Sequence, residues 1–366
     1  MDPRVERLAK LLVHYSLKLK KGQLLKIQGG YVAKPLMLAL YEEALKVGAN
    51  PYIQVLIPEA EEMYYKYATD DQLKYIAPMK TVEVDKIDAF LSIWGAQNTR
   101  YLAGVDTQKQ VASRKYTRHL MKKFFTRTAN GSMSWCGTQY PTHADAQEAD
   151  MSLTEYEDFV YQAGHVHKGD PVKHWMKVSK EQDRLAKIMN KFDKIHVQSP
   201  NADLKLSVKG RKWINCAGTE NFPDGEIFTS PLENSAEGFI RYTYPAIYGG
   251  REVEDVRFEF KKGKVVNESA VKNQDYLTKM LDIDKGGRFI GEFAIGTNYE
   301  IKKFTKNILF DEKIGGTCHL AVGASIPESG GKNDSSIHWD MICDLKKDSQ
   351  ITADGKVIYK NGKFTI

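Results

Sequence analysis

The sequence lacks long hydrophobic runs and contains little cysteine. No apolar stretch approaches the ~20 residues needed to span a bilayer, and residues 1–5 carry charges where a secretion signal would be apolar. The four cysteines are far apart and show no CxxC pairing, which is typical of reduced thiols in a protein core; they are Cys136, Cys216, Cys318 and Cys343. We therefore expect a soluble cytoplasmic protein with no membrane partner.

Several common catalytic motifs are also absent. There is no Walker-type glycine loop, no GxGxxG, no GxSxG and no HExxH, so nucleotide chemistry and serine hydrolysis lose support. Lys and Arg number 53 against 47 Asp and Glu, a net charge of only +6 that is spread along the chain. The densest basic stretch, residues 114–127, lies on a predicted helix and is interpreted as a solvated face. We expect no nucleic acid partner.

The length of 366 residues predicts two domains, since one domain usually takes about 100–200 residues. In residues 1–185, helical and strand-like patterns alternate, which predicts an α/β domain with a mostly parallel sheet. The expected helices are an amphipathic one at the N-terminus, 34–47 and 107–125, and the expected strands are 23–28, 52–57 and 86–94.

Residues 186–366 have a different character, with the boundary placed near residue 185 beside a charged helix at 180–191. Short strand-like runs separated by turn signals predict an α+β domain rich in antiparallel strands. The expected elements are strands at 194–198, 203–208, 237–242, 253–260 and 264–266, a helix at 273–281, and further strands around Glu292, His319 and His338.

The segment His338-Trp339-Asp340 is the most informative feature of this second half. In a strand, the imidazole and the carboxylate would face the same side. Polar residues that could bind a metal interrupt other apolar runs at Glu226, Glu292 and Glu312, and His319 follows a Gly-containing turn.

Each of these residues also has an ordinary structural interpretation. Glu226 could lie at an exposed strand edge and Glu312 in an exposed turn, and His319 could be a hydrogen-bonded core histidine. His338 and Asp340 could form a buried ion pair. Glu292, however, stands alone in an apolar run, where a carboxylate needs a partner or a metal.

Because all six lie in the last 141 residues, we interpret them together as a carboxylate and histidine metal site. Such a ligand set suits Zn, Co or Mn, and an acid-rich set can hold two ions through a bridging carboxylate, which favours hydrolysis. Two other histidine segments are not expected to bind metal. His165-Val166-His167 is predicted to be an exposed loop, and His143 to begin a helix.

Residues 221–231 and 310–321, together with His338-Trp339-Asp340, resemble the thermophilic metalloaminopeptidase family of the aminopeptidase T type. The resemblance extends weakly over nearly the whole chain. It implies a two-domain, homodimeric exopeptidase that holds two divalent ions in its C-terminal domain and removes single residues from free peptide N-termini. The implied ligands are Glu226, Glu292, His319, His338 and Asp340, with Glu312 as a further ligand or a general base and Glu292 as the bridge.

The sequence departs from this family at one position. The family's catalytic members have a tyrosine seven residues after the histidine equivalent to His319, and here Ile326 occupies that position. Isoleucine cannot donate a hydrogen bond to an oxyanion. The candidates for a substitute hydroxyl are Tyr242, Tyr244 and Tyr248.

Two alternative functions follow. The C-terminal region also resembles ring-cleaving dihydroxypyridine dioxygenases, for which His319, His338 and Asp340 would form the two-histidine, one-carboxylate site of a single Fe(II). The other alternative is a catalytically impaired homologue that keeps the metal site without turning over peptides.

Overall fold

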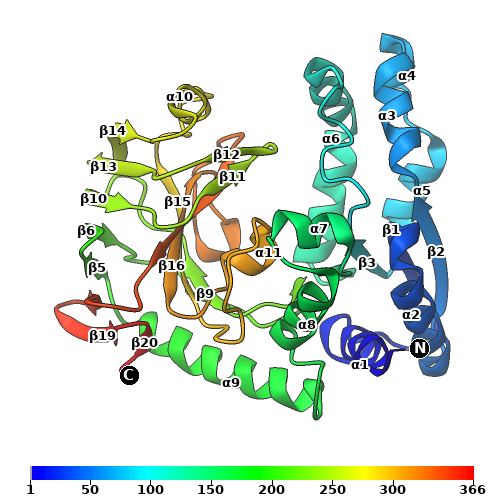
Figure 1. Ribbon diagram of the computed structural model, residues 1–366, viewed down its shortest axis with the longest axis horizontal. Helices are drawn as coiled ribbons and strands as arrows, with labels where there is room; N and C mark the ends of the chain where they lie inside the picture. Colours follow the sequence, from blue (N-terminus) through cyan, green and yellow to red (C-terminus); the bar gives the residue numbers. More distant parts are fainter. Residues whose placement is uncertain (1) are drawn as a thin grey trace. The chain divides into compact units, whose positions relative to one another are not determined.

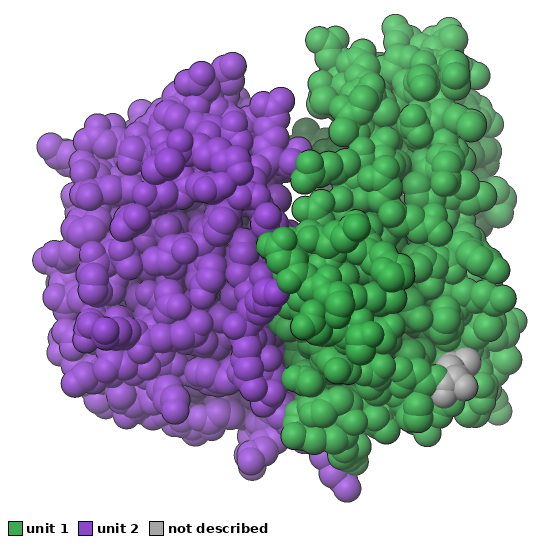
Figure 2. Space-filling model, in the orientation of Figure 1, with its two compact units in different colours: residues 1–172, 218–222 green, residues 173–217, 223–366 purple. Residues whose placement is uncertain are grey.

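The computed structural model describes residues 2–366, which form two compact units (Figures 1 and 2). Unit 1 contains the residues up to Val172 together with Gly218–Phe222, and unit 2 contains Lys173–Ala217 and Pro223–Ile366. The predicted boundary at 185 lies inside helix α9 (Pro171–Met189). In the described part of the chain, no helix combines the length and the apolar character required to cross a membrane.

Unit 1 is built on a five-stranded sheet in the order β2-β1-β3-β4-β8, in which all neighbouring strands are parallel. The strands are β1 (Leu24–Gly30), β2 (Asn50–Leu56), β3 (Ala89–Trp94), β4 (Ser134–Gln139) and β8 (Asn221–Phe222). The predicted α/β class with a parallel sheet is therefore confirmed.

The helices of unit 1 include several that the sequence pattern did not predict. They are α1 (Pro3–Leu11) with a π-helical turn at Leu12–Ser16, a 3-10 turn at Tyr31–Ala33, α2 (Lys34–Val47), α3 (Pro58–Tyr67), α4 (Asp70–Lys74), α5 (Pro78–Lys86), α6 (Thr107–Ala129), α7 (His143–Glu148) and α8 (Leu153–Ala163). Helix α2 matches its prediction residue for residue, because Gly48 ends it in the left-handed conformation with φ of 84°. Helices α3 and α5 bury no residue and so carry no apolar stripe that could reveal them.

Unit 2 contains antiparallel sheets, as predicted. One has eight strands in the order β14-β13-β10-β6-β5-β18-β19-β20, one has five in the order β17-β16-β15-β9-β7, and β11 pairs with β12. The first comprises β5 (Lys194–Ser199), β6 (Ala202–Ser207), β10 (Glu237–Arg241), β13 (Arg257–Lys261), β14 (Lys264–Ser269), β18 (Gln350–Ala353), β19 (Lys356–Lys360) and β20 (Lys363–Phe364). The short pair is β11 (Ala246–Tyr248) and β12 (Arg251–Val253), so the predicted strand 253–260 is interrupted.

The five-stranded sheet of unit 2 positions the candidate site. Its strands are β7 (Ile214–Cys216), β9 (Glu226–Thr229), β15 (Ile290–Gly296), β16 (Thr317–Gly323) and β17 (His338–Asp344), and the remaining helices of the unit are α10 (Gln274–Leu281), α11 (Ile308–Asp311) and a 3-10 turn at Pro327–Ser329.

Alternate residues of this sheet point to opposite faces. One face is apolar and belongs to the hydrophobic core of unit 2; it carries Ile227, Phe293, Ile295, Cys318, Leu320, Val322, Trp339, Met341 and Cys343. The other face carries the acidic and histidine residues described next. Strands β9, β15, β16 and β17 therefore contribute one face of the sheet to the core and carry polar groups on the other face.

Candidate metal centre

The strand register brings five of the six predicted ligands to one face of the five-stranded sheet, and the sixth, Glu312, follows helix α11. Ala321 of β16 is paired with Glu292 of β15 on one side and with Asp340 of β17 on the other. Two residues further along β15, Ala294 is paired with His319, and two residues beyond that, Gly296 is paired with Glu226. The small residues between the ligands leave space that larger side chains would fill.

Glu292 lies between the two histidines. Its Oε2 atom is 3.1 Å from Nε2 of His338, and its Oε1 atom is 3.8 Å from Nε2 of His319. Asp340 approaches His338 as well, with 3.5 Å between Oδ2 and Nε2. Each oxygen of Glu292 thus faces a different imidazole.

A bulge in β15 between Ile290 and Glu292 helps to place Glu292. Gly291 occupies this bulge, and a Cβ atom there would lie 2.1 Å from the carbonyl oxygen of Ala324. That carbonyl accepts a hydrogen bond of 2.8 Å from Nδ1 of His338. The backbone therefore fixes the ring of His338 and leaves its Nε2 atom to face the carboxylates.

The ligand atoms form three linked groups, each with its atoms within 4.8 Å of one another. The groups are Glu226 with Glu292 and His319, Glu292 with His338 and Asp340, and Glu312 with His319 and Asp340. All six predicted residues thus lie in one cluster. Glu292, His319 and Asp340 each belong to two of these three groups, so the groups share members.

The structure excludes two of the ordinary structural interpretations, those in which Glu226 and Glu312 are exposed. Glu226, which could have lain at an exposed strand edge, is only 4 % exposed, because β9 is covered on both sides by β15 and β7. Glu312 is not in an exposed turn either, since its side chain is 15 % exposed at the end of α11. Both carboxylates face the interior of the cluster.

Sequence reasoning missed two charged members of the site. The Nζ atom of Lys313 lies 2.6 Å from Oε1 of Glu226 and 2.5 Å from Oε1 of Glu312. It also lies 3.7 Å from Oδ1 of Asp224, which is 1 % exposed. The sequence offered little signal, because Glu-Lys and Pro-Asp-Gly are common at surfaces.

Burial and neighbouring charges shift the proton affinities of these groups. Burial raises the pKa of Glu226 to about 8, against the opposing effect of Lys313, and burial also raises the pKa of Glu312. For His319, burial opposes the charged form, but Glu292, Glu226 and Asp340 outweigh it and raise its pKa to about 9. The carboxylates of Asp340 and Glu292 similarly raise the pKa of His338 well above its ordinary value.

Two buried carboxylate oxygens without hydrogen-bond partners also indicate that the cluster is suited to divalent cations. Oε2 of Glu226 and Oδ1 of Asp340 are buried and have no hydrogen-bond partner, although burying a bare carboxylate oxygen is costly. Carboxylate oxygens and imidazole nitrogens are ligands that zinc, cobalt and manganese accept. The side chain of His338 is 33 % exposed, whereas that of His319 is 1 % exposed, so the cluster opens to solvent at the His338 end.

None of the tyrosines considered as substitutes donates a hydrogen bond to the six predicted ligands within the described chain. Tyr242 packs in the core with its ring 5.5 Å from that of Phe258. The hydroxyl of Tyr244 donates to Asp344, and the ring of Tyr248 contacts Trp339, which faces the core. At the departure from the family, Ile326 donates its backbone N–H to Ser230.

The other histidine segments belong to unit 1, whereas the cluster belongs to unit 2. His143 begins α7 after the N-cap Thr142, as predicted. His165 and His167 contact each other edge to face at 5.4 Å between ring centroids, and they are half-buried where an exposed loop was expected. Among residues 2–366, neither segment belongs to a group of three or more potential ligands.

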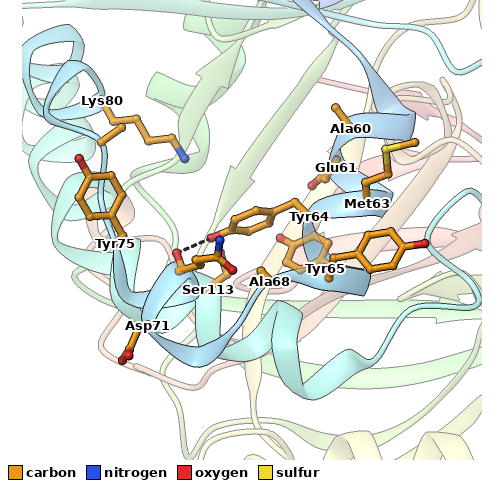
Figure 3. A pocket seen from close by; sticks show the side chains of 13 residues that line it. Ala60, Glu61, Met63, Tyr64, Tyr65, Ala68, Asp71, Tyr75, Lys80 and Ser113 are labelled. Carbon is orange, nitrogen blue, oxygen red and sulfur yellow. Dashed lines mark hydrogen bonds between the residues drawn. The ribbon is translucent and has the colours of Figure 1, made fainter.

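Unit 1 has a groove of about 1030 Å³ lined by residues of α3, α4 and neighbouring segments (Figure 3). Its walls are rich in tyrosine, and the hydroxyl of Tyr64 donates to the carbonyl of Gln72 at 3.1 Å. The groove contains no histidine or cysteine, and in the described chain its acidic residues Glu61 and Asp71 join no potential ligand group. Its chemistry is therefore unlike that of the cluster in unit 2.

The antiparallel sheet with its carboxylate and histidine face is the framework of a metal-dependent hydrolase. The family model described as thermophilic metalloprotease (M29) matches residues 1–364, and the chain belongs to this family. The resemblance found in the sequence is thus confirmed, and the iron dioxygenase alternative is not favoured.

Curated relatives and a solved structure agree with this assignment. The chain is 25 % identical to "Aminopeptidase 2" of Geobacillus stearothermophilus over 99 % of this chain and 98 % of that protein. It is 24 % identical to "Aminopeptidase T" of Thermus thermophilus, covering 99 % and 96 % of the two chains. The structure of wild-type AmpT from Thermus thermophilus matches its fold with a TM-score of 0.86, 22 % identity and 99 % coverage of each chain.

Proposed function

We propose that this protein is an aminopeptidase that releases single residues from the free N-termini of peptides with the help of two divalent cations. The single observation that carries the proposal is the convergence of six ligand side chains, five from one sheet face and Glu312 from the end of α11, in three groups that share members. The full-length similarity to proteins named aminopeptidases supports the reaction. The proposed ligands are Glu226, Glu292, Glu312, His319, His338 and Asp340.

The charge of the cluster supports two cations. The cluster contains five carboxylates, those of Asp224, Glu226, Glu292, Glu312 and Asp340, and one ammonium group, that of Lys313, which contacts three of them. With the histidines neutral, the five negative charges and one positive charge leave minus four, which two divalent ions neutralise and one does not. Since the two oxygens of Glu292 face different histidines, Glu292 is our proposed bridging ligand.

When bound, divalent ions supply Lewis acidity and lower the pKa of water to about 7. The residues of the chain provide orientation and proton transfer. Glu312 is the proposed general base, because its burial increases its proton affinity and the base in such a reaction needs a pKa near the working pH. His338, at the open end of the cluster, lies where a peptide would enter.

A second candidate function is supported by Ile326. A homologue without a hydroxyl donor at this position would bind metal and stabilise its fold without rapid peptide turnover. Turnover measurements on the metal-loaded protein separate the two candidates.

The partners and the location of the protein are also proposals. We propose peptide substrates, a homodimer and a cytoplasmic location, with Zn, Co or Mn as the physiological ions. The cysteines support the location, because three of the four are buried, as is typical of reduced thiols in a protein core.

The decisive experiment strips the protein with a chelator, reloads it with Zn²⁺, Co²⁺ or Mn²⁺, and measures both ions per chain and the hydrolysis of leucine p-nitroanilide. N-acetyl-leucine p-nitroanilide is the control substrate, because an aminopeptidase requires the free amine. We expect two ions per chain and hydrolysis of the free-amine substrate only. Two ions without turnover would support the second candidate, and a single ion would contradict the dinuclear site.

A further inference from the structure

Lys313 is the most deeply buried lysine in the described chain, with its side chain only 2 % exposed. Its backbone is held on both sides: its N–H donates to the carbonyl of Phe310, and its own carbonyl accepts from the N–H of Asn298, both at 3.0 Å. The side chain is therefore directed into the cluster by the turn that follows α11.

The ammonium group contacts one oxygen of each of two proposed ligands. Oε1 of Glu226 lies 2.6 Å away and Oε1 of Glu312 lies 2.5 Å away. The other oxygen of Glu226, Oε2, faces Nε2 of His319 at 3.3 Å and has no hydrogen-bond donor. Lys313 thus occupies one side of the carboxylate and leaves its second oxygen free.

Three carboxylates face the ammonium group of Lys313. Its Nζ atom lies 2.6 Å from Glu226, 2.5 Å from Glu312 and 3.7 Å from Asp224. An ordinary buried ion pair needs one carboxylate, whereas this lysine contacts two that belong to the metal-ligand groups.

We infer that Lys313 is a positioning residue and a fixed counter-ion of the proposed metal centre. It holds Glu226 and Glu312 so that each offers a single oxygen to a cation, and its charge limits how strongly the cluster attracts cations. The inference rests on the proposed function, since it requires these two carboxylates to be metal ligands.

The test compares the wild-type protein with Lys313→Met and Lys313→Gln, using Co²⁺ as the probe. Met keeps the apolar stem, and Gln keeps a hydrogen-bond donor without the charge. Lys346→Met is the matched control, because Lys346 pairs with Asp344 and is 45 % exposed. Co²⁺ affinity is measured by chelator competition in mildly alkaline buffer, and the visible absorption per bound Co²⁺ reports its coordination number.

We expect both Lys313 variants to bind Co²⁺ at least about tenfold more tightly, because a positive charge close to the cation is removed. We also expect weaker visible absorption per Co²⁺, since the released carboxylates can chelate with both oxygens and raise the coordination number. Lys346→Met should match the wild type in both measurements.

Unchanged or weaker Co²⁺ binding by the Lys313 variants, with the wild type binding normally, would overturn this inference alone. Failure of the wild type to bind Co²⁺ would instead overturn the proposed function and this inference with it. If the variants do not fold, they are refolded with saturating Co²⁺, which should replace the ammonium as counter-ion to the carboxylates. Failure to fold even then would overturn the counter-ion role.

Discussion

Replacing Glu292 with glutamine tests the centre of the cluster with little change in shape. The pKa of His319 rises from 6.5 to about 9 in the folded protein, which corresponds to roughly 3 kcal/mol in favour of the protonated form. The interaction with Glu292 is the largest of those that raise the pKa of His319, and Glu292 and His319 are both almost fully buried. We therefore expect the metal-free Glu292→Gln variant to lose about 2–3 kcal/mol of stability at pH 6.5.

The stability loss can be measured as a shift in the melting temperature. For a unit of about 150–250 residues, each kcal/mol changes Tm by roughly 2–4 °C, so Tm should fall by roughly 4–12 °C in chelator-treated protein. The difference should shrink above pH 9, where His319 is neutral in the wild type as well. Metal content should fall from two ions per chain to one or none, because the proposed bridge is lost.

Glu300→Gln is the matched control for this variant, because Glu300 is exposed and its Oε2 atom makes a long contact, 3.9 Å, with Nζ of the exposed Lys302. It should leave Tm and metal content unchanged. A Glu292→Gln protein that keeps two ions per chain, or melts like the wild type at pH 6.5, would refute the central position assigned to Glu292.

Three further predictions concern pH, backbone geometry and the missing hydroxyl. His319 and Glu226 bind protons more strongly in the folded state, with pKa values of about 9 and 8, so the stability of chelator-treated protein should fall as pH rises from about 5 to 9. The Tm increase caused by Zn²⁺ should grow over the same range, because protons leave the ligands. Calorimetry with and without Zn²⁺ measures both effects, and a Zn²⁺ effect independent of pH would contradict the prediction. Gly291→Ala should displace the Ala324 carbonyl that holds His338 and weaken Zn²⁺ binding about 10- to 100-fold. Chelator competition measures the affinity, and an unchanged value would show that the hydrogen bond from His338 to Ala324 is dispensable. Ile326→Tyr should raise kcat for leucine p-nitroanilide by about a hundredfold if the new hydroxyl reaches the oxyanion. Ile326→Phe is the control, because it adds the ring without the hydroxyl. Equal rates for the two variants would argue against the loss of a hydrogen-bond donor at position 326.

The parts of the fold that the sequence predicted are those with a strong burial pattern. Helix α2 buries residues three and four positions apart, and strands β5 and β6 alternate more buried with less buried positions. Helices α3 and α5 were not predicted because their residues are not buried, so no apolar periodicity marks them. Strand β4 was missed because Ser134–Gln139 does not alternate apolar and polar residues, and its four buried positions are set by neighbouring strands rather than by hydrophobicity.

The candidate site was predictable in its ligands but not in its charge balance. His338 and Asp340 could be placed on one side of a strand from spacing alone, and Glu292 stood out because an isolated carboxylate in an apolar run is costly. Lys313 could not be identified in the same way. Its role depends on the distance between its ammonium group and Glu226, which is 87 positions away in the sequence, and no local pattern encodes that contact.

The two faces of the β15–β16 region connect folding with metal binding. Phe293 and Leu320 are fully buried in the core, while Glu292 and His319, their immediate neighbours in sequence, are almost as buried among charges. A sheet face crowded with carboxylates repels itself unless protons, Lys313 or bound cations compensate. Because the same strands form both faces, neutralising the ligand face should stabilise the packing of the core face, and metal binding should therefore stabilise the whole of unit 2 rather than a local loop.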